Sequence, residues 1–394
     1  MEIGRMIINY TFNNFRSFYN DAEFSMTANA GKVLKRYPDN YSTLPGGLKL
    51  LKSAVMVGEN AGGKSNFIYS LQFLKSLFQD NSVVKTVSSN INSNAGKDQE
   101  SFDITFCVEN GRVYHYCLTI DSKRIIAESL FYKNEINKKE QSVFEAYWAP
   151  EAKAYHFEDS GIEEPVRNAL RKNAGALGLF TTKLALLGNE YAIEAVNWMN
   201  NTLYPVSLTE GSLSVKQPSE QDIRILNDPA YLDVFRMVDY SICGIIVDRE
   251  QPFSKTVISR RRADGTTMDR ELQYDSTGVR EFFVWAIQIF RVVYENRVVF
   301  ADEMDRVLNP VLSERVISFI NGKTHCGQFI FSTHNVLHLD LKTYMKEQIY
   351  FVTKIRDSLN SELYSLSDFP EVRYETTKIY EFYMKGILGG TAPT

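Results

Sequence analysis

Residues 58–65 read Gly-Glu-Asn-Ala-Gly-Gly-Lys-Ser and match the pattern G-x-x-x-x-G-K-[ST] at every fixed position. Glycines at both ends of such a loop let the backbone bend so that successive N–H groups point inward at an anion, and the helix that follows adds the positive end of its dipole. The lysine of this pattern reaches the outer phosphates of a nucleotide, and the hydroxyl ligates magnesium. The stretch therefore predicts a phosphate-binding loop in which Lys64 contacts phosphate and Ser65 contacts Mg²⁺.

The residues on either side of this loop fit a strand followed by a helix. Residues 53–57 are an apolar run of strand length, and after the loop large apolar residues recur at spacings of four, three and four, at Phe67, Leu71, Leu74 and Phe78. That spacing is typical of one face of a helix packed on a sheet. Strand, loop and helix in this order predict an α/β fold built around a nucleotide-binding loop.

Length and composition favour a globular protein. The chain has 394 residues, of which 44% are hydrophobic and 23% charged, and a net charge of -4 argues against a protein that coats nucleic acid non-specifically. Its four cysteines form no C-x-x-C pair, which favours reduced thiols over disulfides or a zinc site and a cytoplasmic location. No apolar run approaches the roughly 18 to 20 residues that span a bilayer, so we expect no membrane domain.

The first part of the chain has the alternation of strands. Residues 6–12 and 22–26 predict an edge hairpin, and residues 101–108 and 113–120 predict a second hairpin turned at Asn110-Gly111. Further strand-like runs at 124–132 and 143–148 complete an antiparallel wing. We interpret residues 1–149 as an N-terminal lobe that contains the phosphate-binding loop.

From about residue 150 the apolar period becomes helical. Helix starts are indicated at Glu163-Glu164-Pro165, at the capping-box pattern Ser219-x-x-Asp222 and at Pro229, with a break at Pro205. We interpret residues 150–243 as an inserted helical subdomain. Residues 244–394 form the C-terminal lobe, which opens with a hairpin at 256–274 turned at Asp264-Gly265.

Two strand ends in the C-terminal lobe carry candidate catalytic groups. The apolar strand 298–301 runs into Asp302 and Glu303, an arrangement in which the first acid holds Mg²⁺ and the second orients or deprotonates the attacking water. The run 328–333 ends at His334, whose imidazole is suited to contact the terminal phosphate. The order of phosphate loop, acid pair and histidine strengthens each of these assignments.

Between them, residues 276–280 (Ser-Thr-Gly-Val-Arg) open a strongly apolar helical run. A serine and a glycine at a helix N-terminus can clamp a second phosphate, because the hydroxyl and the backbone N–H groups face the same anion. Taken alone, the segment is explained more simply by an ordinary serine cap on a core helix.

These motifs together resemble the ATP-binding-cassette ATPase heads of the SMC type. The features that carry the resemblance are the GENAGGKS loop, the Ser-Thr-Gly before an apolar helix, the strand VVFADE followed by Met304-Asp305, and Ser-Thr-His at a strand end. More narrowly, the chain is similar to the stand-alone ATPases of two-gene abortive-infection (anti-phage) systems, of the RloA and AbiL type, which share the opening Asn14-Phe15-Arg16-Ser17-Phe18. Residues 150–240 match poorly, Asn309-Pro310 stands where the family commonly has His-Pro, and Ser-Thr-Gly is a reduced form of the transporter signature Leu-Ser-Gly-Gly-Gln.

The resemblance implies a P-loop NTPase fold of ATP-binding-cassette type and a slow, dimer-dependent ATPase. ATP and Mg²⁺ would be sandwiched between two copies of the chain, with Ser276 and Gly278 of one copy contacting the ATP held by the other and Asp305 at the dimer contact. Glu303 and His334 would be the catalytic residues, and Ser65 and Asp302 would bind Mg²⁺. The residues that would bind ATP are Gly58, Asn60, Gly62, Gly63, Lys64, Ser65, Asn66 and Arg16.

The resemblance also implies a biological role as the sensor or regulatory subunit of an anti-phage system, acting on a separate effector protein such as a nuclease or toxin encoded alongside. Two other functions stay open: a DNA-maintenance ATPase, disfavoured because no long heptad runs are present, and a non-catalytic scaffold that binds nucleotide for structure. Arginines 260–262 and Arg270 fit either a solvated hairpin tip or a contact with a phosphate backbone or a partner. The spacing His334-x-x-x-His338 does not predict zinc, because Asn335 stands where a zinc protease has glutamate.

Overall fold

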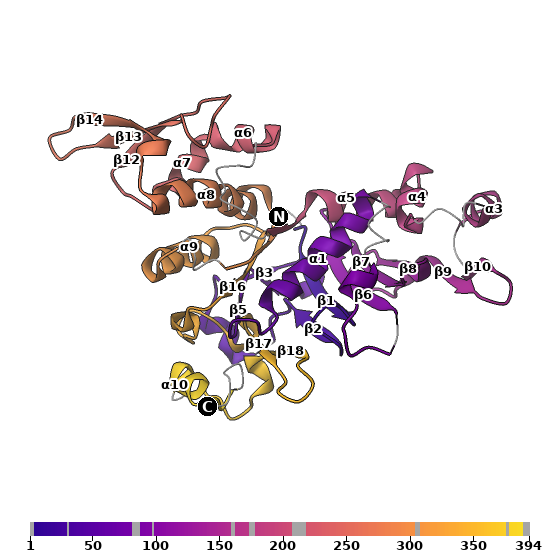
Figure 1. Ribbon diagram of the computed structural model, residues 1–394. Helices are drawn as coiled ribbons and strands as arrows, with labels where there is room; N and C mark the ends of the chain where they lie inside the picture. The colour runs from indigo at the N-terminus through magenta and orange to yellow at the C-terminus, as the bar shows by residue number, and fades with distance from the viewer. Residues whose placement is uncertain are drawn as a thin grey trace.

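The computed structural model describes residues 4–29, 31–80, 87–96, 98–158, 162–172, 178–206, 218–303, 308–375 and 378–388. Among these residues two large sheets, of seven and six strands, lie on either side of helix α1 (Lys64–Gln79). A third, three-stranded sheet lies at the upper left of Figure 1 and forms an arm together with helices α6 (Glu220–Leu226), α7 (Pro229–Phe235) and α8 (Thr277–Glu295).

The seven-stranded sheet is antiparallel throughout and forms the predicted wing. Its order is β10 (Ala154–Glu158), β9 (Gln141–Ala149), β8 (Ile125–Lys133), β7 (Val113–Ile120), β6 (Glu100–Cys107), β1 (Ile7–Asn13) and β2 (Ala22–Ser25). The β1–β2 pair lies at the edge, and the β6–β7 hairpin turns where Gly111 takes a φ of 85°. Both predicted hairpins of this sheet are therefore confirmed.

The six-stranded sheet holds the nucleotide-binding motifs. Its order is β11 (Leu203–Val206), β15 (Val298–Ala301), β16 (Gln328–Thr333), β5 (Ser53–Val57), β17 (Ile349–Lys354) and β18 (Ser361–Ser365). All its pairings are parallel except β17 with β18. The three-stranded sheet consists of β12 (Ile242–Ile246), β13 (Val257–Arg261) and β14 (Thr267–Glu271). Its β13–β14 hairpin turns at Gly265, as predicted. A two-stranded sheet pairs β3 (Tyr41–Thr43) with β4 (Lys49–Leu51).

Strand β5 is buried on both faces, and its alternating residues enter two different hydrophobic clusters. Ala54 and Met56 face the cluster that also contains α1 and the inner side of the antiparallel sheet, whereas Val55 and Val57 face the cluster of α8 (Thr277–Glu295) and α9 (Pro310–Gly322). Phe67 on α1 packs edge-on against Tyr10 of β1 at 5.9 Å between ring centroids. The phosphate-binding loop thus follows a strand that is packed against a hydrophobic cluster on each face.

In the described part of the region expected to be helical, the strands β10 and β11 lie among the helices. Helices α3 (Glu164–Lys172), α4 (Phe180–Leu186), α5 (Glu190–Asn201), α6 (Glu220–Leu226) and α7 (Pro229–Phe235) lie there; α2 (Val87–Asn90) precedes them and α10 (Ile379–Met384) follows near the C-terminus. The predicted capping box of Ser219 and Asp222 opens α6. However, residues 154–158 form β10, and β11 joins the parallel sheet beside β15.

Candidate nucleotide-binding site

The carboxyl ends of β5, β16 and β15 meet at one edge of the parallel sheet. Because these three strands are neighbours and run in the same direction, the loop after β5, His334 after β16 and Asp302 after β15 all leave the sheet at that edge. Ligands of open α/β sheets bind outside this edge. The fold therefore brings together three motifs that lie up to 276 positions apart in the sequence.

The glycines of the loop are required by close contacts with the C-terminal part of the sheet. A Cβ on Gly58 would lie 2.1 Å from the carbonyl oxygen of Val352, and one on Gly63, which has a φ of 121°, would lie 2.4 Å from Oγ of Ser361. A Cβ on Gly62 would lie 3.0 Å from the same Val352 carbonyl oxygen. No side chain fits at Gly58 or Gly63 without displacing β17 or β18.

The ammonium group of Lys64 lies inside the loop. Its side chain is buried, and Nζ donates hydrogen bonds to the carbonyl oxygens of Gly58 at 2.6 Å and Glu59 at 3.0 Å. Nδ1 of His334 lies 3.3 Å from the same Nζ. Since an ammonium has only donors, Nδ1 accepts in this contact and the proton of a neutral ring is on Nε2. The structure thus pairs two of the residues predicted to contact phosphate.

Two serines that sequence reasoning did not select hold the loop from outside. Oγ of Ser361 donates to the carbonyl of Gly62 at 2.6 Å and lies 2.8 Å from Oγ of Ser17, and Nδ2 of Asn66 donates to Ser17 Oγ at 2.8 Å. Asn66, predicted to bind ATP, therefore contacts the N-terminal segment. Ser17 lies in the opening segment that carries part of the resemblance, but its contact with Ser361 spans 344 residues of sequence.

The remaining loop residues and Arg16 lie at the surface of this edge. Asn60 is exposed at the loop tip, and Ser65 is half-buried in the first turn of α1. Arg16 has a φ of 50° and its guanidinium lies 4.5 Å from the centre of the Tyr69 ring, also on α1. Arg16 is thus held beside the helix that follows the loop.

The acid pair is fixed by a serine of the neighbouring strand. Asp302 is buried; its Oδ1 accepts a hydrogen bond from Ser332 Oγ, and its Oδ2 has no hydrogen-bond partner among the described residues. The backbone N–H of Glu303, which has a φ of 50°, donates to the same Ser332 oxygen at 2.8 Å. A buried carboxylate oxygen without a partner costs free energy unless a cation or donor completes it, so Asp302 fits a divalent cation.

The Ser-Thr-Gly segment lies on the arm and is open to solvent. Ser276, Thr277 and Gly278 are exposed, and a Cβ on Gly278 would meet nothing within 4 Å. Ser276 caps α8 by accepting from the N–H of Val279 at 3.4 Å, so the ordinary capping role is confirmed. None of the hydrogen bonds found among the described residues joins Ser276 or Gly278 to the loop.

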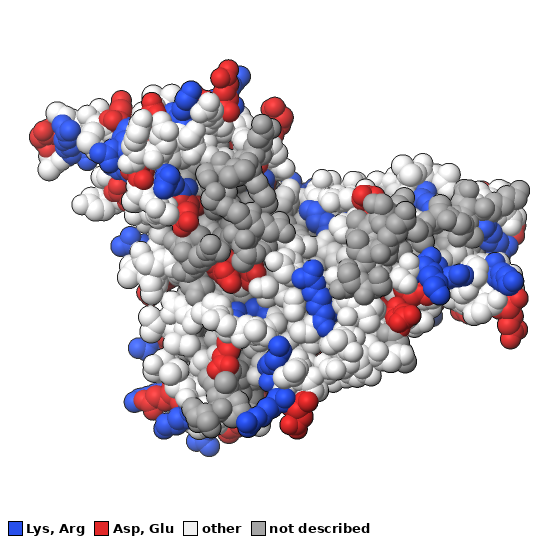
Figure 2. All heavy atoms as spheres, viewed as in Figure 1, with Lys and Arg blue, Asp and Glu red and all other residues white. Residues whose placement is uncertain are grey.

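The arginines of the β13–β14 hairpin differ in their surroundings. Arg260 is bonded to Asp239 at 2.9 Å and, with both terminal nitrogens, to Asp275 next to Ser276. Arg261, Arg262 and Arg270 are exposed. Figure 2 shows basic and acidic side chains interspersed over this arm, without a continuous basic face on the visible side.

Other predictions have mixed outcomes. Asn309 caps α9 by accepting from the N–H of Leu312 at 2.9 Å, with Pro310 in the first turn, which accounts for Asn-Pro at this position. His338 is buried against Phe331 and Tyr344, apart from the loop contact of His334. Asp305 lies outside the described residues. No helix in the described part of the chain has the length and apolar character needed to cross a membrane.

Residues 53–176, which contain the loop and α1, match the family model "AAA domain, putative AbiEii toxin, Type IV TA system". No curated protein matches the chain in sequence.

Among solved structures, similar ones include the SMC head domain from Thermotoga maritima (15% identity, 91% of this chain and 98% of that one, TM-score 0.43). Another is an SMC head bound to the C-winged helix domain of ScpA, with 14% identity, coverage of 91% of this chain and 97% of that chain, and a TM-score of 0.49. A third is the SMC head with a coiled coil and joint from Pyrococcus yayanosii, with 12% identity, coverage of 98% of this chain and 100% of that chain, and a TM-score of 0.47. The predicted fold class is confirmed: the chain is a mixed α/β protein with a P-loop ATPase domain, a parallel core sheet and antiparallel sheets.

Proposed function

We propose that the chain binds and slowly hydrolyses Mg-ATP as a dimer that encloses two nucleotides. The observation that carries this proposal is the meeting of Lys64, His334 and Asp302 at one edge of the parallel sheet, with Lys64 and His334 3.3 Å apart. A phosphate in the loop would replace the carbonyls that Lys64 now contacts, because a charged oxygen accepts a stronger hydrogen bond than a neutral one.

Mg²⁺ would be held by Asp302 and Ser65. The unpartnered, buried Oδ2 of Asp302 supports this assignment, and carboxylate and hydroxyl oxygens suit this hard cation. When bound, the ion would neutralise charge on the phosphates. Glu303, next in sequence, would orient or deprotonate the attacking water, and His334 would contact the terminal phosphate.

A second copy of the chain would complete the site. Ser276 and Gly278 are exposed on the arm, at the N-terminus of a helix of 19 residues, and Arg260 fixes the neighbouring Asp275. Such an end attracts anions, and Ser276 would contribute hydrogen bonds to a charged phosphate, each of about 1.5 to 3 kcal/mol, only when the other subunit presents ATP. Nucleotide binding would then drive association.

We further propose that this cycle controls a separate effector in anti-phage defence. Support comes from the description of the matching family model, which names a putative AbiEii toxin and a type IV toxin–antitoxin system, and from the resemblance of the motifs to abortive-infection ATPases. Capture of an effector protein with a Glu303→Gln variant, and loss of phage protection with Lys64→Ala, would be expected. A scaffold function predicts protection that survives the double variant Lys64→Ala, Glu303→Gln.

The biochemical part is tested by measuring ATP hydrolysis at several protein concentrations. The specific activity should rise with concentration, because the active species is a dimer, and Lys64→Ala should abolish both ATP binding and hydrolysis. Lys123→Ala, which removes an exposed lysine from a turn of the wing, is the matched control. Hydrolysis that persists in Lys64→Ala, or a specific activity independent of concentration, would contradict the proposal.

A further inference from the structure

A cluster of three different ligand-type side chains lies on the outer face of the antiparallel sheet, away from the nucleotide site. In the β6–β7 pair, Asp103 stands directly opposite Cys117, and His115 is two residues before Cys117. Residues two apart on a strand point to the same face. The alternate residues of these strands, such as Ile104 and Tyr116, are buried in the core on the other face. Strand pairing therefore directs Asp103, His115 and Cys117 outward together.

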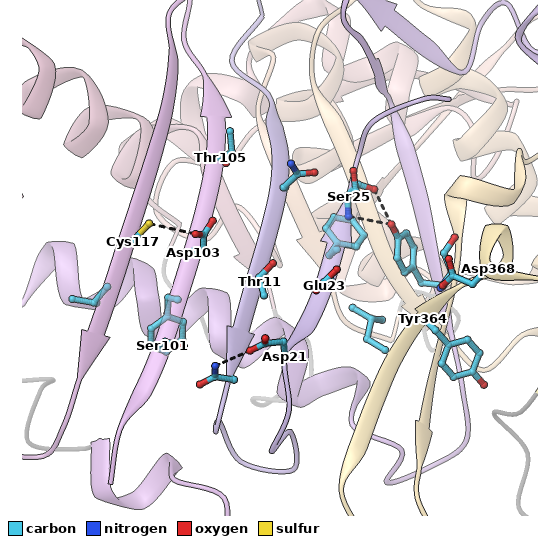
Figure 3. A pocket seen from close by; sticks show the side chains of 18 of the residues that line it. Thr11, Asp21, Glu23, Ser25, Ser101, Asp103, Thr105, Cys117, Tyr364 and Asp368 are labelled. Atoms are coloured by element: carbon cyan, nitrogen blue, oxygen red, sulfur yellow. Dashed lines mark hydrogen bonds between the residues drawn. The ribbon is translucent and has the colours of Figure 1, made fainter. Parts of the chain in front are cut away.

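The ligand atoms of the cluster converge closely. Nε2 of His115 lies 2.8 Å from Oδ2 of Asp103 and 3.2 Å from Sγ of Cys117, and Sγ lies 3.3 Å from the same Oδ2. Figure 3 shows the Cys117–Asp103 contact at the end of the hollow that these residues line. One ring nitrogen carries either one proton or one lone pair, so it cannot form good hydrogen bonds to both neighbours at once. A cation at the centre would be contacted by all three atoms.

The spacing fits a small divalent metal. Zinc bonds sulfur at about 2.3 Å and nitrogen or oxygen at about 2.0 to 2.2 Å, which places tetrahedral ligand atoms about 3.4 to 3.6 Å apart. The three observed separations of 2.8, 3.2 and 3.3 Å would have to widen by roughly 0.3 to 0.6 Å. The Asp103 and His115 side chains are 45% and 28% exposed, so this adjustment needs no rearrangement of the core.

We propose that Asp103, His115 and Cys117 form a mononuclear Zn²⁺ site. Thiolate, imidazole and carboxylate are the ligand types that zinc uses in proteins. Glu140 lies at the other side of the imidazole, with Oε1 3.6 Å from Nδ1 of His115, where a carboxylate fixes the ring of a metal-bound histidine. Lys133 holds the second oxygen of Glu140 at 3.5 Å.

A polar hollow adjoins the proposed site. Asp103 and Cys117 line a cavity of about 870 Å³ between the outer face of the antiparallel sheet and the β17–β18 end of the parallel sheet. Sites with three protein ligands keep one position for water or substrate. Three further carboxylates line the cavity and would raise the local concentration of cations, at Asp21, Glu23 and Asp368. The zinc site is independent of the proposed ATPase function, since no predicted nucleotide contact lines this cavity.

The test uses the full chain loaded with Zn²⁺ or Co²⁺ and dialysed. We expect about one tightly bound metal per chain and, with Co²⁺, a thiolate-to-cobalt absorption band, which an all-oxygen Mg²⁺ site cannot produce. Cys117→Ser should remove the band, while Cys243→Ser should keep it, because Cys243 is a half-buried thiol of another sheet that contacts the Ser259 carbonyl. A wild-type chain without the band, or a band that persists in Cys117→Ser, would overturn the proposal.

Two further variants cover the possibility that Cys117→Ser fails to fold. Asp103→Asn keeps the size of the side chain and should weaken zinc binding at least about tenfold, and Glu140→Gln should weaken it by about 10- to 100-fold, the range for groups that orient a ligand. Zinc affinity would be measured by competition with a chelator, and folding by the melting temperature in chelator. Unchanged zinc affinity in Asp103→Asn would also overturn the proposal.

Discussion

The hydroxyl of Ser332 donates a hydrogen bond of 2.5 Å to Oδ1 of Asp302. Its oxygen also accepts the backbone N–H of Glu303 at 2.8 Å. A single side chain on β16 therefore fixes both acids that follow β15, including the left-handed backbone of Glu303, a conformation that costs a non-glycine residue about 1 to 2 kcal/mol. In the proposed function Ser332 is a positioning residue that links the acid pair to the strand carrying His334.

Ser332→Ala should lower kcat roughly 10- to 100-fold while ATP affinity changes less. The lost hydrogen bond to a charged group is worth about 1.5 to 3 kcal/mol, and each 1.4 kcal/mol is about a factor of ten in rate. The matched control is Ser313→Ala, which removes a buried serine that donates to the neutral Asn309 carbonyl at 3.1 Å. An equal loss of kcat in both variants would show that the effect is one of general stability.

Ser276→Arg should abolish concentration-dependent hydrolysis and leave ATP binding by a single chain intact. The exposed Ser276 caps its own helix and would contact only the partner's nucleotide, so a large side chain there blocks the interface without touching the loop. Thr267→Arg, at an exposed position on the same arm, is the control. Normal hydrolysis by a monomeric Ser276→Arg protein would refute the composite site.

Glu100 should make the fold less stable as the pH rises. Its carboxyl group is fully buried, neither oxygen has a hydrogen-bond partner among the described residues, and burial raises its pKa from 4.5 to about 9, against the opposing effect of Arg16. Between these values the folded chain keeps a proton that the unfolded chain releases, so the free energy of unfolding falls as the pH rises toward about 9.

Glu100→Gln should flatten this dependence, because an amide does not titrate. Denaturant unfolding at about pH 6 and about pH 9 measures the slope, and Glu151→Gln, at an exposed turn, is the control. The slope rather than the absolute stability is compared, since the amide brings its own buried donors. Equal slopes in the wild type and in Glu100→Gln would contradict this account.

Local signals were sufficient for much of the fold. The loop at 58–65 and the hairpin turns at Gly111 and Gly265 depend on positive φ angles, which few residues other than glycine adopt, so their sequences identify them. The strand before the loop could be predicted because four of its five residues are apolar, as expected of a strand buried on both faces of a parallel sheet.

Features that depend on pairing between distant parts of the chain could not be predicted from the sequence. The break predicted at Pro205 is a strand, β11, and proline is tolerated there because β11 is the edge of its sheet. β10 has a period-two pattern, with Tyr155 and Phe157 buried, but it is short and followed by helices. The contact of Ser17 with Ser361 and the convergence of Asp103 on Cys117 arise only once the strands are paired, so linear spacing could not predict either.

The domain boundaries at residues 150 and 243 stay a prediction. The segment between them supplies helices that pack on both halves of the molecule and a strand to each large sheet. Its helix α4 is fixed to the wing by Glu128, which accepts from the N–H groups of Phe180 at 2.6 Å and Thr181 at 2.9 Å. Removal of this segment alone would therefore take one edge strand from each large sheet.

Whether ATP drives dimer formation is tested by the molar mass of Glu303→Gln in solution, measured by light scattering with and without Mg-ATP. Glu303 follows the buried Asp302 and is proposed to act on the attacking water, so its amide should allow ATP binding but stop hydrolysis. A dimer that encloses two ATP molecules predicts the mass of two chains with Mg-ATP and of one chain without it. The double variant Glu303→Gln, Ser276→Arg should keep the mass of one chain under both conditions. For Glu303→Gln alone, a mass of one chain under both conditions, with ATP bound, would contradict this prediction.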